Sequence, residues 1–281
     1  MAPEDAGACQ AVWHDAFPAM RAAYHLPGAP VTDADREHVR RRVAALCGTD
    51  PDGSVVATVD DVVVGFAQAL RRERLWVLSQ LAVAPAHQGR GAGRDLLEAA
   101  LDSAEPGGPG MIMSSRDPKA MHRYVQAGFA LRPSLVAMGT PRRSALPATG
   151  AVREGTEADL DFVARVDRLL RGAPHGSELT GLLDDGERLV VLPGRGYAVA
   201  RPGGVRVVGG LDEEAATVLL AEVLGGEPAG SVIDVNWITG AQQWAISLCS
   251  ALGMELVPMG AVMVRGRPGP LAPYLPTGAY G

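Results

Sequence analysis

The residues best suited to chemistry form a glycine-rich turn that follows an apolar strand and leads into an amphipathic helix. The segment runs from Leu81 to Arg94 and reads LAVAPAHQGRGAGR, with glycines at Gly89, Gly91 and Gly93. Glycines lack the Cβ atoms that keep a ligand from the backbone, and the free N–H groups of a first helical turn attract anions. Arg90 and Arg94 add positive charge. The turn therefore predicts a phosphate-binding site.

Two of three phosphate-binding patterns do not fit this turn. A P-loop needs a lysine followed by serine or threonine, whereas the only lysine of the chain, Lys119, precedes Ala120. A dinucleotide-binding turn has the spacing GxGxxG directly after a strand. Here the spacing is GxGxG, and Pro85 separates it from the strand, although Asp117 stands at a tolerable position for the acid of that fold.

The third pattern fits. Gln88–Gly93 (QGRGAG) resembles the acetyl-coenzyme A turn of the GNAT superfamily of N-acetyltransferases, [Q/R]-x-x-G-x-[G/A]. The preceding strand ends in LAVAP, at Leu81–Pro85, and Asp117–Phe129 (DPKAMHRYVQAGF) resembles the family's N-x-x-A-x-x-[L/F]-Y-x-x-x-G-F. The resemblance covers most of residues 1–140.

This resemblance implies a site for acetyl-CoA as cosubstrate. The backbone of Leu81 and Val83 is expected to pair with the pantetheine arm, and the N–H groups from Gly89 to Arg94 to hold the pyrophosphate. Asp117 replaces the family's usual asparagine, which keeps an acceptor but loses the amide donors. The full implied set is Leu81, Val83, Gln88, Gly89, Arg90, Gly91, Ala92, Gly93, Arg94 and Asp117.

The resemblance also assigns catalytic roles. Tyr124 is expected to protonate the departing coenzyme A thiolate, a task that a phenol with a pKa near ~10 can perform; the alternative is a purely structural core aromatic. The base is less evident, because the strand leading to Val83 offers Ser79 and Gln80 where many relatives have glutamate. Glu73, the nearest carboxylate, is one candidate base, and its alternative role is an ion pair with a neighbouring arginine.

The order of elements repeats along the chain, so we expect two tandem copies of one α+β unit, each a mostly antiparallel mixed sheet flanked by helices. The expected divisions are an active domain (1–140), a proline-containing linker (141–150), a degenerate second copy (151–265) and an extended C-terminal arm (266–281). Expected helices lie near 3–17, 33–46, 90–103, 118–126, 156–170, 177–184, 212–224 and 240–251. Expected strands lie near 54–59, 62–69, 75–83, 111–114, 129–138, 188–192, 196–201, 205–208, 231–236 and 255–264.

The second copy lacks both coenzyme elements. Its equivalent of the phosphate turn leads into Asp212, Glu213 and Glu214, which stabilise a helix N-terminus but repel a pyrophosphate. Cys249 stands where Tyr124 stands in the first copy. We therefore expect a catalytically silent copy that either forms one side of the acceptor pocket or serves only as scaffold. If the arm docks between the copies, the terminal carboxylate of Gly281 is a second candidate base.

Composition excludes several other classes of protein. With 26 basic and 32 acidic residues and a net charge of −6, the chain lacks the positive field that non-specific nucleic-acid binding needs. No apolar run approaches the ~20 residues that cross a bilayer, so we expect a cytoplasmic protein without membrane contact. Scattered cysteines predict neither a disulfide framework nor a metal site, and we expect them to pack as small apolar residues: Cys9, Cys47 and Cys249.

The histidines share no spacing with acids or a nucleophile, so we expect all of them at the surface: His14, His25, His38, His87, His122 and His175. The tryptophans are expected in the core or at its rim rather than in a substrate cage: Trp13, Trp76, Trp237 and Trp244.

The sequence thus predicts an acetyl-CoA-dependent N-acetyltransferase in which an amine attacks directly in a ternary complex, because no cysteine lies near the turn to carry the acyl group. A non-catalytic coenzyme A sensor or an interaction scaffold is the alternative. The acceptor is a small-molecule or peptide amine, and a homodimer is left open.

Overall fold

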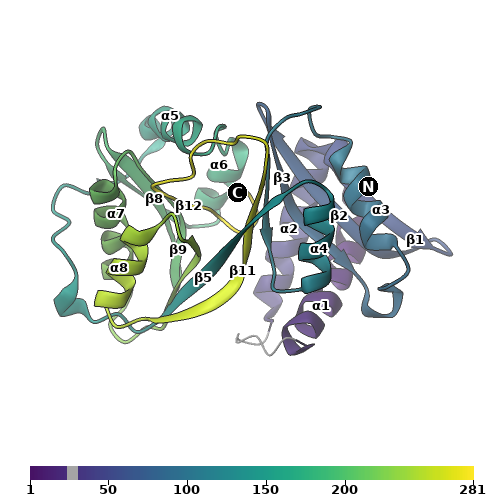
Figure 1. The fold of residues 1–281 in the computed structure, drawn as a ribbon, viewed down its shortest axis with the longest axis horizontal. Coiled ribbons are helices and arrows are strands. Elements are labelled where there is room, and N and C mark those ends of the chain that lie inside the picture. The colour runs from purple at the N-terminus through teal and green to yellow at the C-terminus, as the bar shows by residue number, and fades with distance from the viewer. Residues whose placement is uncertain (24–30) are drawn as a thin grey trace.

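The computed structural model describes residues 1–23 and 31–281, in which helices cover both faces of one long, twelve-stranded sheet (Figure 1). Its helices are α1 (Ala6–Ala23), α2 (Asp33–Thr49), α3 (Ala92–Leu101), α4 (Pro118–Gln126), α5 (Leu160–Leu170), α6 (Ser177–Asp184), α7 (Glu213–Gly226) and α8 (Gln243–Ala251). Its strands are β1 (Ser54–Val59), β2 (Val62–Arg72), β3 (Leu75–Val83), β4 (Gly110–Ser114), β5 (Ala130–Gly139), β6 (Arg153–Glu154), β7 (Arg188–Leu192), β8 (Gly196–Arg201), β9 (Gly204–Gly210), β10 (Ile233–Thr239), β11 (Glu255–Arg265) and β12 (Tyr274–Leu275).

The α+β fold class is confirmed, and most elements begin and end within a few residues of the expected positions. β1, β3 and α4 have the expected bounds. The largest shift is at α1, which was expected at 3–17 and runs to Ala23. β10 was expected at 231–236 and runs to Thr239, because its second part pairs with β5 through Ile238 and Thr239. Among the described residues no helix is both long and apolar enough to cross a membrane.

The two halves of the chain exchange their last long strands. The sheet has the order β1-β2-β3-β4-β11-β5-β10-β9-β8-β7-β6, so β11 of the second half lies between β4 and β5 of the first. β11 pairs antiparallel with β4, from Ala261↔Ser114 to Arg265↔Gly110, and β5 pairs antiparallel with β10. Figure 1 shows β5 and β11 crossing between the halves. The domain bounds at 140 and 151 stay a prediction, but the halves share one sheet.

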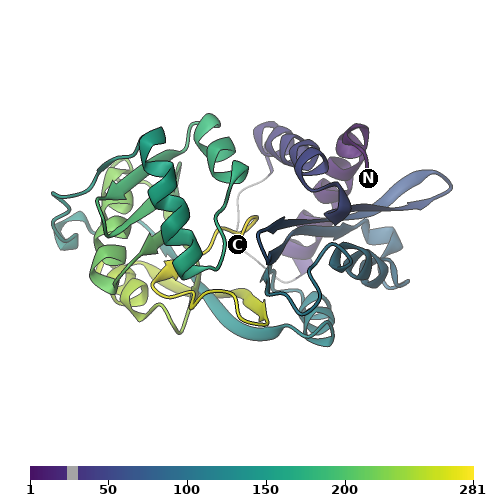
Figure 2. The ribbon, with the colours of Figure 1, turned by 90° about the horizontal axis from the view of Figure 1, so that it is seen from above.

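The first half has a core on each face of its strands, because alternate residues of a strand point to opposite faces. Phe66 and Ala82 pack against α1 and α2, whereas Ala67 and Leu78 pack against α3 and α4. Figure 2 shows these helix pairs on opposite sides of the strands. A third core joins the halves, where residues of β3 and β4, such as Val77 and Met111, pack with α5 and β9.

The crowded centre of the exchanged sheet gives a stability prediction. A Cβ added to buried Gly260 of β11 would lie 1.7 Å from the carbonyl oxygen of Ser114 in β4, so the backbone of one strand must move. We expect Gly260→Ala to lower the free energy of unfolding by about 1–3 kcal/mol in urea titrations. In the matched control, Gly181→Ala on exposed α6, the added Cβ meets nothing within 4 Å and should stabilise by about 0.5–1 kcal/mol. Equal unfolding free energies for wild type and Gly260→Ala would contradict this account of the packing.

Candidate active site

The sheet opens between two parallel strands in the first half. β3 pairs with β4 only from Trp76↔Gly110 to Leu78↔Ile112. β3 continues to Val83 and remains paired with β2 on its other edge, with an irregularity opposite Gln68 and Ala69 that makes Ser79 an extra residue. From Ser79 to Val83, the edge of β3 that faces β4 therefore pairs with no strand of the described chain. An unpaired strand edge is a site where an extended ligand can add main-chain hydrogen bonds.

The glycine-rich turn follows directly at the end of this open edge. Gly89 and Gly91 have positive φ angles of 79° and 100°, and Gly91 is the residue that precedes α3. Within the described chain, the backbone N–H groups from Gly89 to Gly93 donate no hydrogen bond. A Cβ added at Gly89 would meet nothing within 4 Å, so the turn opens to solvent. These N–H groups fit an anion such as a pyrophosphate.

Two details of the turn differ from expectation. The N–H of Arg94 donates to the carbonyl oxygen of Gly91 at 2.8 Å, so it is used within the helix. The guanidinium of Arg94 pairs with the carboxylate of Asp95, the next residue, at 2.8 Å, which offsets part of its charge. Arg90 is exposed and forms no ion pair with any described residue. The Gln88 side chain instead donates to the carbonyl oxygen of Val83 at 2.9 Å and thereby fastens the turn to β3.

Tyr124 of α4 lies beside the opening. It is buried and belongs to the apolar cluster that contains Leu78 and Val83 of β3 and Leu96 of α3. Burial, with a smaller contribution from Asp117, raises the pKa of the Tyr124 phenol above its usual value, so the hydroxyl stays protonated at neutral pH. That hydroxyl makes no hydrogen bond with a described residue, which leaves it available as a donor to a ligand. Asp117 itself caps α4, its carboxylate accepting from the N–H of Lys119 at 2.8 Å.

Glu73 lies at the wrong end of β3. It occupies the turn between β2 and β3, and its half-exposed carboxylate pairs with Arg168 of α5 at 2.7 Å. Six residues of extended strand, about 20 Å, separate it from Ser79, where β3 leaves β4. This placement does not support Glu73 as the base, and the ion pair explains the residue instead, although with a partner from the other half of the chain.

Gly281 lies in the middle of the molecule, between the halves (Figures 1 and 2). A Cβ on Gly281 would lie 3.1 Å from the side chain of Val77, one residue before the end of the β3–β4 pairing. The Gly281 carbonyl oxygen accepts a hydrogen bond from the Tyr274 hydroxyl at 2.9 Å and lies 3.0 Å from Nε2 of His175. The C-terminal arm therefore brings residue 281 to β3 just before the point where this strand leaves β4.

A buried polar network holds this end of the arm, and the sequence did not indicate it. His175 was expected at the surface but is 2% exposed, because its Nδ1 bonds the Asp167 carboxylate at 2.8 Å. The fully buried Arg171 donates to the carbonyl oxygen of Tyr280 at 2.6 Å, and the Tyr197 hydroxyl donates to Asp167. Burial opposes ionisation of Asp167, but His175 and the other donors outweigh it and hold the Asp167 pKa below its usual value. Of the other histidines, His25 lies outside the described residues.

A cavity of about 430 Å³ lies between the halves. Residues of α1, α2, β8, β9, β10 and the arm line it, among them Trp13, Arg42, Arg206 and Trp237. Trp76 and Trp244 lie in the core as expected, whereas Trp13 and Trp237 border a cavity of ligand size. Arg42 connects the cavity to β3, because its guanidinium donates to the side chain of Gln80 at 3.1 Å.

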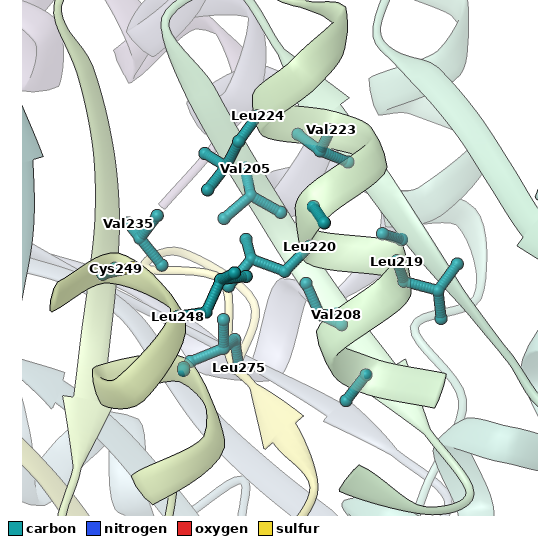
Figure 3. Close-up of a cluster of buried hydrophobic side chains, with 14 of the residues drawn as sticks. Val205, Val208, Leu219, Leu220, Val223, Leu224, Val235, Leu248, Cys249 and Leu275 are labelled. Atoms are coloured by element: carbon teal, nitrogen blue, oxygen red, sulfur yellow. The ribbon is translucent and has the colours of Figure 1, made fainter. Parts of the chain in front are cut away.

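The equivalent opening of the second half is filled by the chain itself. β9 meets its parallel neighbour β10 at Gly204↔Asp234, and β12 then pairs with the free edge of β9 through Tyr274↔Gly209 and Leu275↔Val208. Figure 3 shows Leu275 in the apolar cluster with Val208 and Leu248. At the adjoining turn, Asp212 already caps α7 by accepting from the N–H of Ala215 at 2.8 Å.

Comparisons with known proteins agree with this geometry. Residues 13–129 match the model of the acetyltransferase (GNAT) family. A Pyrococcus horikoshii protein provisionally named an acetyltransferase is 18% identical and has a TM-score of 0.77, over 100% of this chain and 94% of that one. A GCN5-related N-acetyltransferase from Sphaerobacter thermophilus is 17% identical and has a TM-score of 0.55, over 96% of this chain and 95% of that one. A tandem GNAT protein from the clavulanic acid biosynthesis pathway is 15% identical and has a TM-score of 0.54, over 94% of this chain and 96% of that one. The search of curated proteins found no match.

Residues 13–129 therefore match the GNAT family, and the whole chain has the fold of tandem GNAT proteins. The family and its fold support acyl transfer as the general activity.

The buried network gives a second stability prediction. Asp167→Asn keeps the shape of the side chain but removes the charge that pairs with buried His175, so the free energy of unfolding should fall by roughly 3 kcal/mol at pH 7. Because the folded-state pKa of Asp167 is lowered, its contribution is complete above the unfolded value of about 3.9 and is lost as the pH falls through the folded value. Urea titrations between pH 7 and pH 3 should therefore show the unfolding free energies of the two proteins converging in acid.

The matched control is Asp161→Asn, at an exposed position of α5, which should change the free energy of unfolding by less than about 0.5 kcal/mol. A difference between wild type and Asp167→Asn that stays constant down to pH 3 would show that the carboxylate charge does not stabilise the fold.

Proposed function

We propose that this protein is an acetyl-CoA-dependent N-acetyltransferase whose active site lies in the first half and whose acceptor enters from the cavity between the halves. One observation carries the proposal: the unpaired edge of β3 runs into a turn with free N–H groups, beside a buried phenol. A ligand that is extended at one end and anionic at the other fits these features together.

The residues proposed for acetyl-CoA are those that the sequence implied. The edge of β3 at Leu81 and Val83 receives the pantetheine arm, and the N–H groups from Gly89 to Gly93 bind the pyrophosphate. Arg90 contributes an unpaired positive charge, while Gln88 positions the turn and Asp117 positions α4. Arg94 contributes less than expected, because its N–H and its charge already have partners.

Acetyl-CoA supplies an acetyl thioester, which a neutral amine attacks at the carbonyl carbon with loss of the coenzyme A thiolate. Tyr124 donates its hydroxyl proton toward the sulfur, because the phenol is held protonated next to the opening of the sheet. Direct attack in a ternary complex is supported by the state of the cysteines. Cys9, Cys47 and Cys249 are all buried, and burial raises the pKa of Cys9 and Cys249 to about 12, so they are poor nucleophiles.

For the base that deprotonates the acceptor ammonium, we propose the carboxylate of Gly281. Support comes from its position against Val77 and from the network of His175, Tyr274 and Arg171 that holds the end of the arm. The second half then has two tasks, since it supplies this network and forms one side of the acceptor cavity. A non-catalytic coenzyme A sensor remains the rival function, and it is tested below.

Tyr124→Phe tests the acid. We expect kcat for thiol release with a reactive amine to fall by about 10²–10⁴-fold, with KM for acetyl-CoA nearly unchanged, because only proton donation is removed. Gly91→Val is the matched contrast: a branched residue at a φ of 100° distorts the turn, so KM for acetyl-CoA should rise instead. Saturable acetyl-CoA binding without thiol release for any amine would favour the sensor, and full activity of Tyr124→Phe would refute the role of the phenol.

The Gly281 carboxylate can be tested by changing the terminal group alone. Protein ligation can produce the chain with a C-terminal amide, which keeps an oxygen that can accept from Tyr274 but cannot take up the proton of the acceptor. We expect kcat to fall by about 10²-fold or more near pH 7, with unchanged binding of acetyl-CoA. The control is the same ligation that restores the free carboxylate. Equal turnover of the two products would exclude Gly281 as the base.

A further inference from the structure

The cavity between the halves contains an arginine without an acidic partner. Arg201 and Arg206 also line it, but their guanidinium groups pair with Asp234 and Glu187. Arg42 of α2 forms no ion pair with any described residue. Its Nη2 donates to the amide oxygen of Gln80, and its Nε is buried without a hydrogen-bond partner. A buried guanidinium with an unused donor is costly unless an anion completes it.

The charges around Arg42 do not supply that anion. Asp35 is the carboxylate that lines the described cavity, but it is exposed and accepts from the N–H and hydroxyl of Thr32 at 2.8 and 2.7 Å. Burial lowers the pKa of Arg42; Tyr280 opposes this effect, and the nearby charge of Arg206 adds a smaller lowering. An anion that enters the cavity therefore relieves the unfavourable burial of the Arg42 charge.

Two tryptophans from different elements also line the cavity, and one of them is held in a constrained backbone conformation. Trp13 comes from α1 and Trp237 from β10. Trp237 has a φ of 61°, which is rare for a bulky residue and is tolerated where the surroundings impose it. The arm contributes to this constraint, since a Cβ on Gly278 would lie 3.1 Å from the indole nitrogen of Trp237.

The cavity lies next to the part of β3 where the proposed acetyl transfer takes place. Gln80, the partner of Arg42, is on β3 just beyond Leu78, where β3 leaves β4. Val77, which contacts Gly281, lies shortly before that point on the same strand. A small molecule whose anionic end binds Arg42 therefore has its other end near the opening of the sheet.

We infer that the acceptor is a small amine that carries a carboxylate, of the amino-acid type, and that Arg42 binds this carboxylate while the tryptophans contact its side chain. The inference rests on the proposed function for the fate of the amine, but the carboxylate site can be tested separately. Arginine suits this task because its planar fork pairs with both carboxylate oxygens.

The test uses the twenty common α-amino acids, each compared with its own carboxamide, in titration calorimetry with and without coenzyme A. We expect at least one amino acid to bind about 10- to 100-fold more tightly than its carboxamide, as a charge-assisted hydrogen bond implies. Arg42→Gln should remove this preference, and Arg42→Lys should retain part of it. The matched control is Arg40→Gln on the same helix, an exposed arginine whose ion-pair partner among the described residues is Glu37, and it should leave binding unchanged.

Thiol release from acetyl-CoA with the same pairs separates this inference from the proposed function. Binding that depends on Arg42 but gives no thiol release with any amine upholds the carboxylate site and refutes the acetyltransferase. Thiol release that is equally fast for acids and carboxamides, in wild type and in Arg42→Gln, upholds the enzyme and overturns the carboxylate site. Failure of every amino acid to bind also overturns the carboxylate site.

Discussion

The exchange of β5 and β11 at the centre of the sheet is the constraint on which the other features depend. Each strand completes the sheet next to the other half, so that β4 is paired by β11 and β10 by β5. The halves are thereby held in one orientation by main-chain hydrogen bonds rather than by side-chain contacts alone. A cavity between them and an arm threaded across them need such a fixed frame, because a loosely linked pair would present neither with a constant shape.

Each half of the molecule has a strand that leaves its parallel neighbour, but the exposed strand edge is used differently in the two halves. In the first half, β3 leaves β4 and its edge stays free next to a turn with free N–H groups. In the second half, β9 has an equivalent free edge, but β12 pairs with it and Leu275 fills the space below. Asp212 completes the difference, since it caps the N-terminus of α7, which would otherwise attract an anion. One copy thus has a potential ligand site where the other has a segment of its own chain.

The C-terminal arm connects the two halves of the molecule. Tyr274 pairs with the second half through its backbone and bonds Gly281 through its hydroxyl, while Gly281 lies against Val77 of the first half. The second half is therefore more than a support for the first. It positions the end of the arm through Asp167, His175 and Arg171, which it buries together, and it contributes Trp237 and two arginines to the cavity.

The sequence by itself determined the fold class and the glycine-rich turn, because both depend on local order: glycines at positive φ after a strand, a helix that begins there, and a tyrosine at a fixed distance before Gly128. It also determined that the second copy lacks these elements. It did not determine the strand exchange, since β5 and β11 have patterns that suit either neighbour. It predicted His175 at the surface and did not indicate Arg42, because the surroundings of both come from other elements of the fold. Asp167 of α5 and Gly281 of the arm contact His175, and Gln80 of β3 contacts Arg42. Burial and charge pairing depend on which segments meet, and only the tertiary structure decides that.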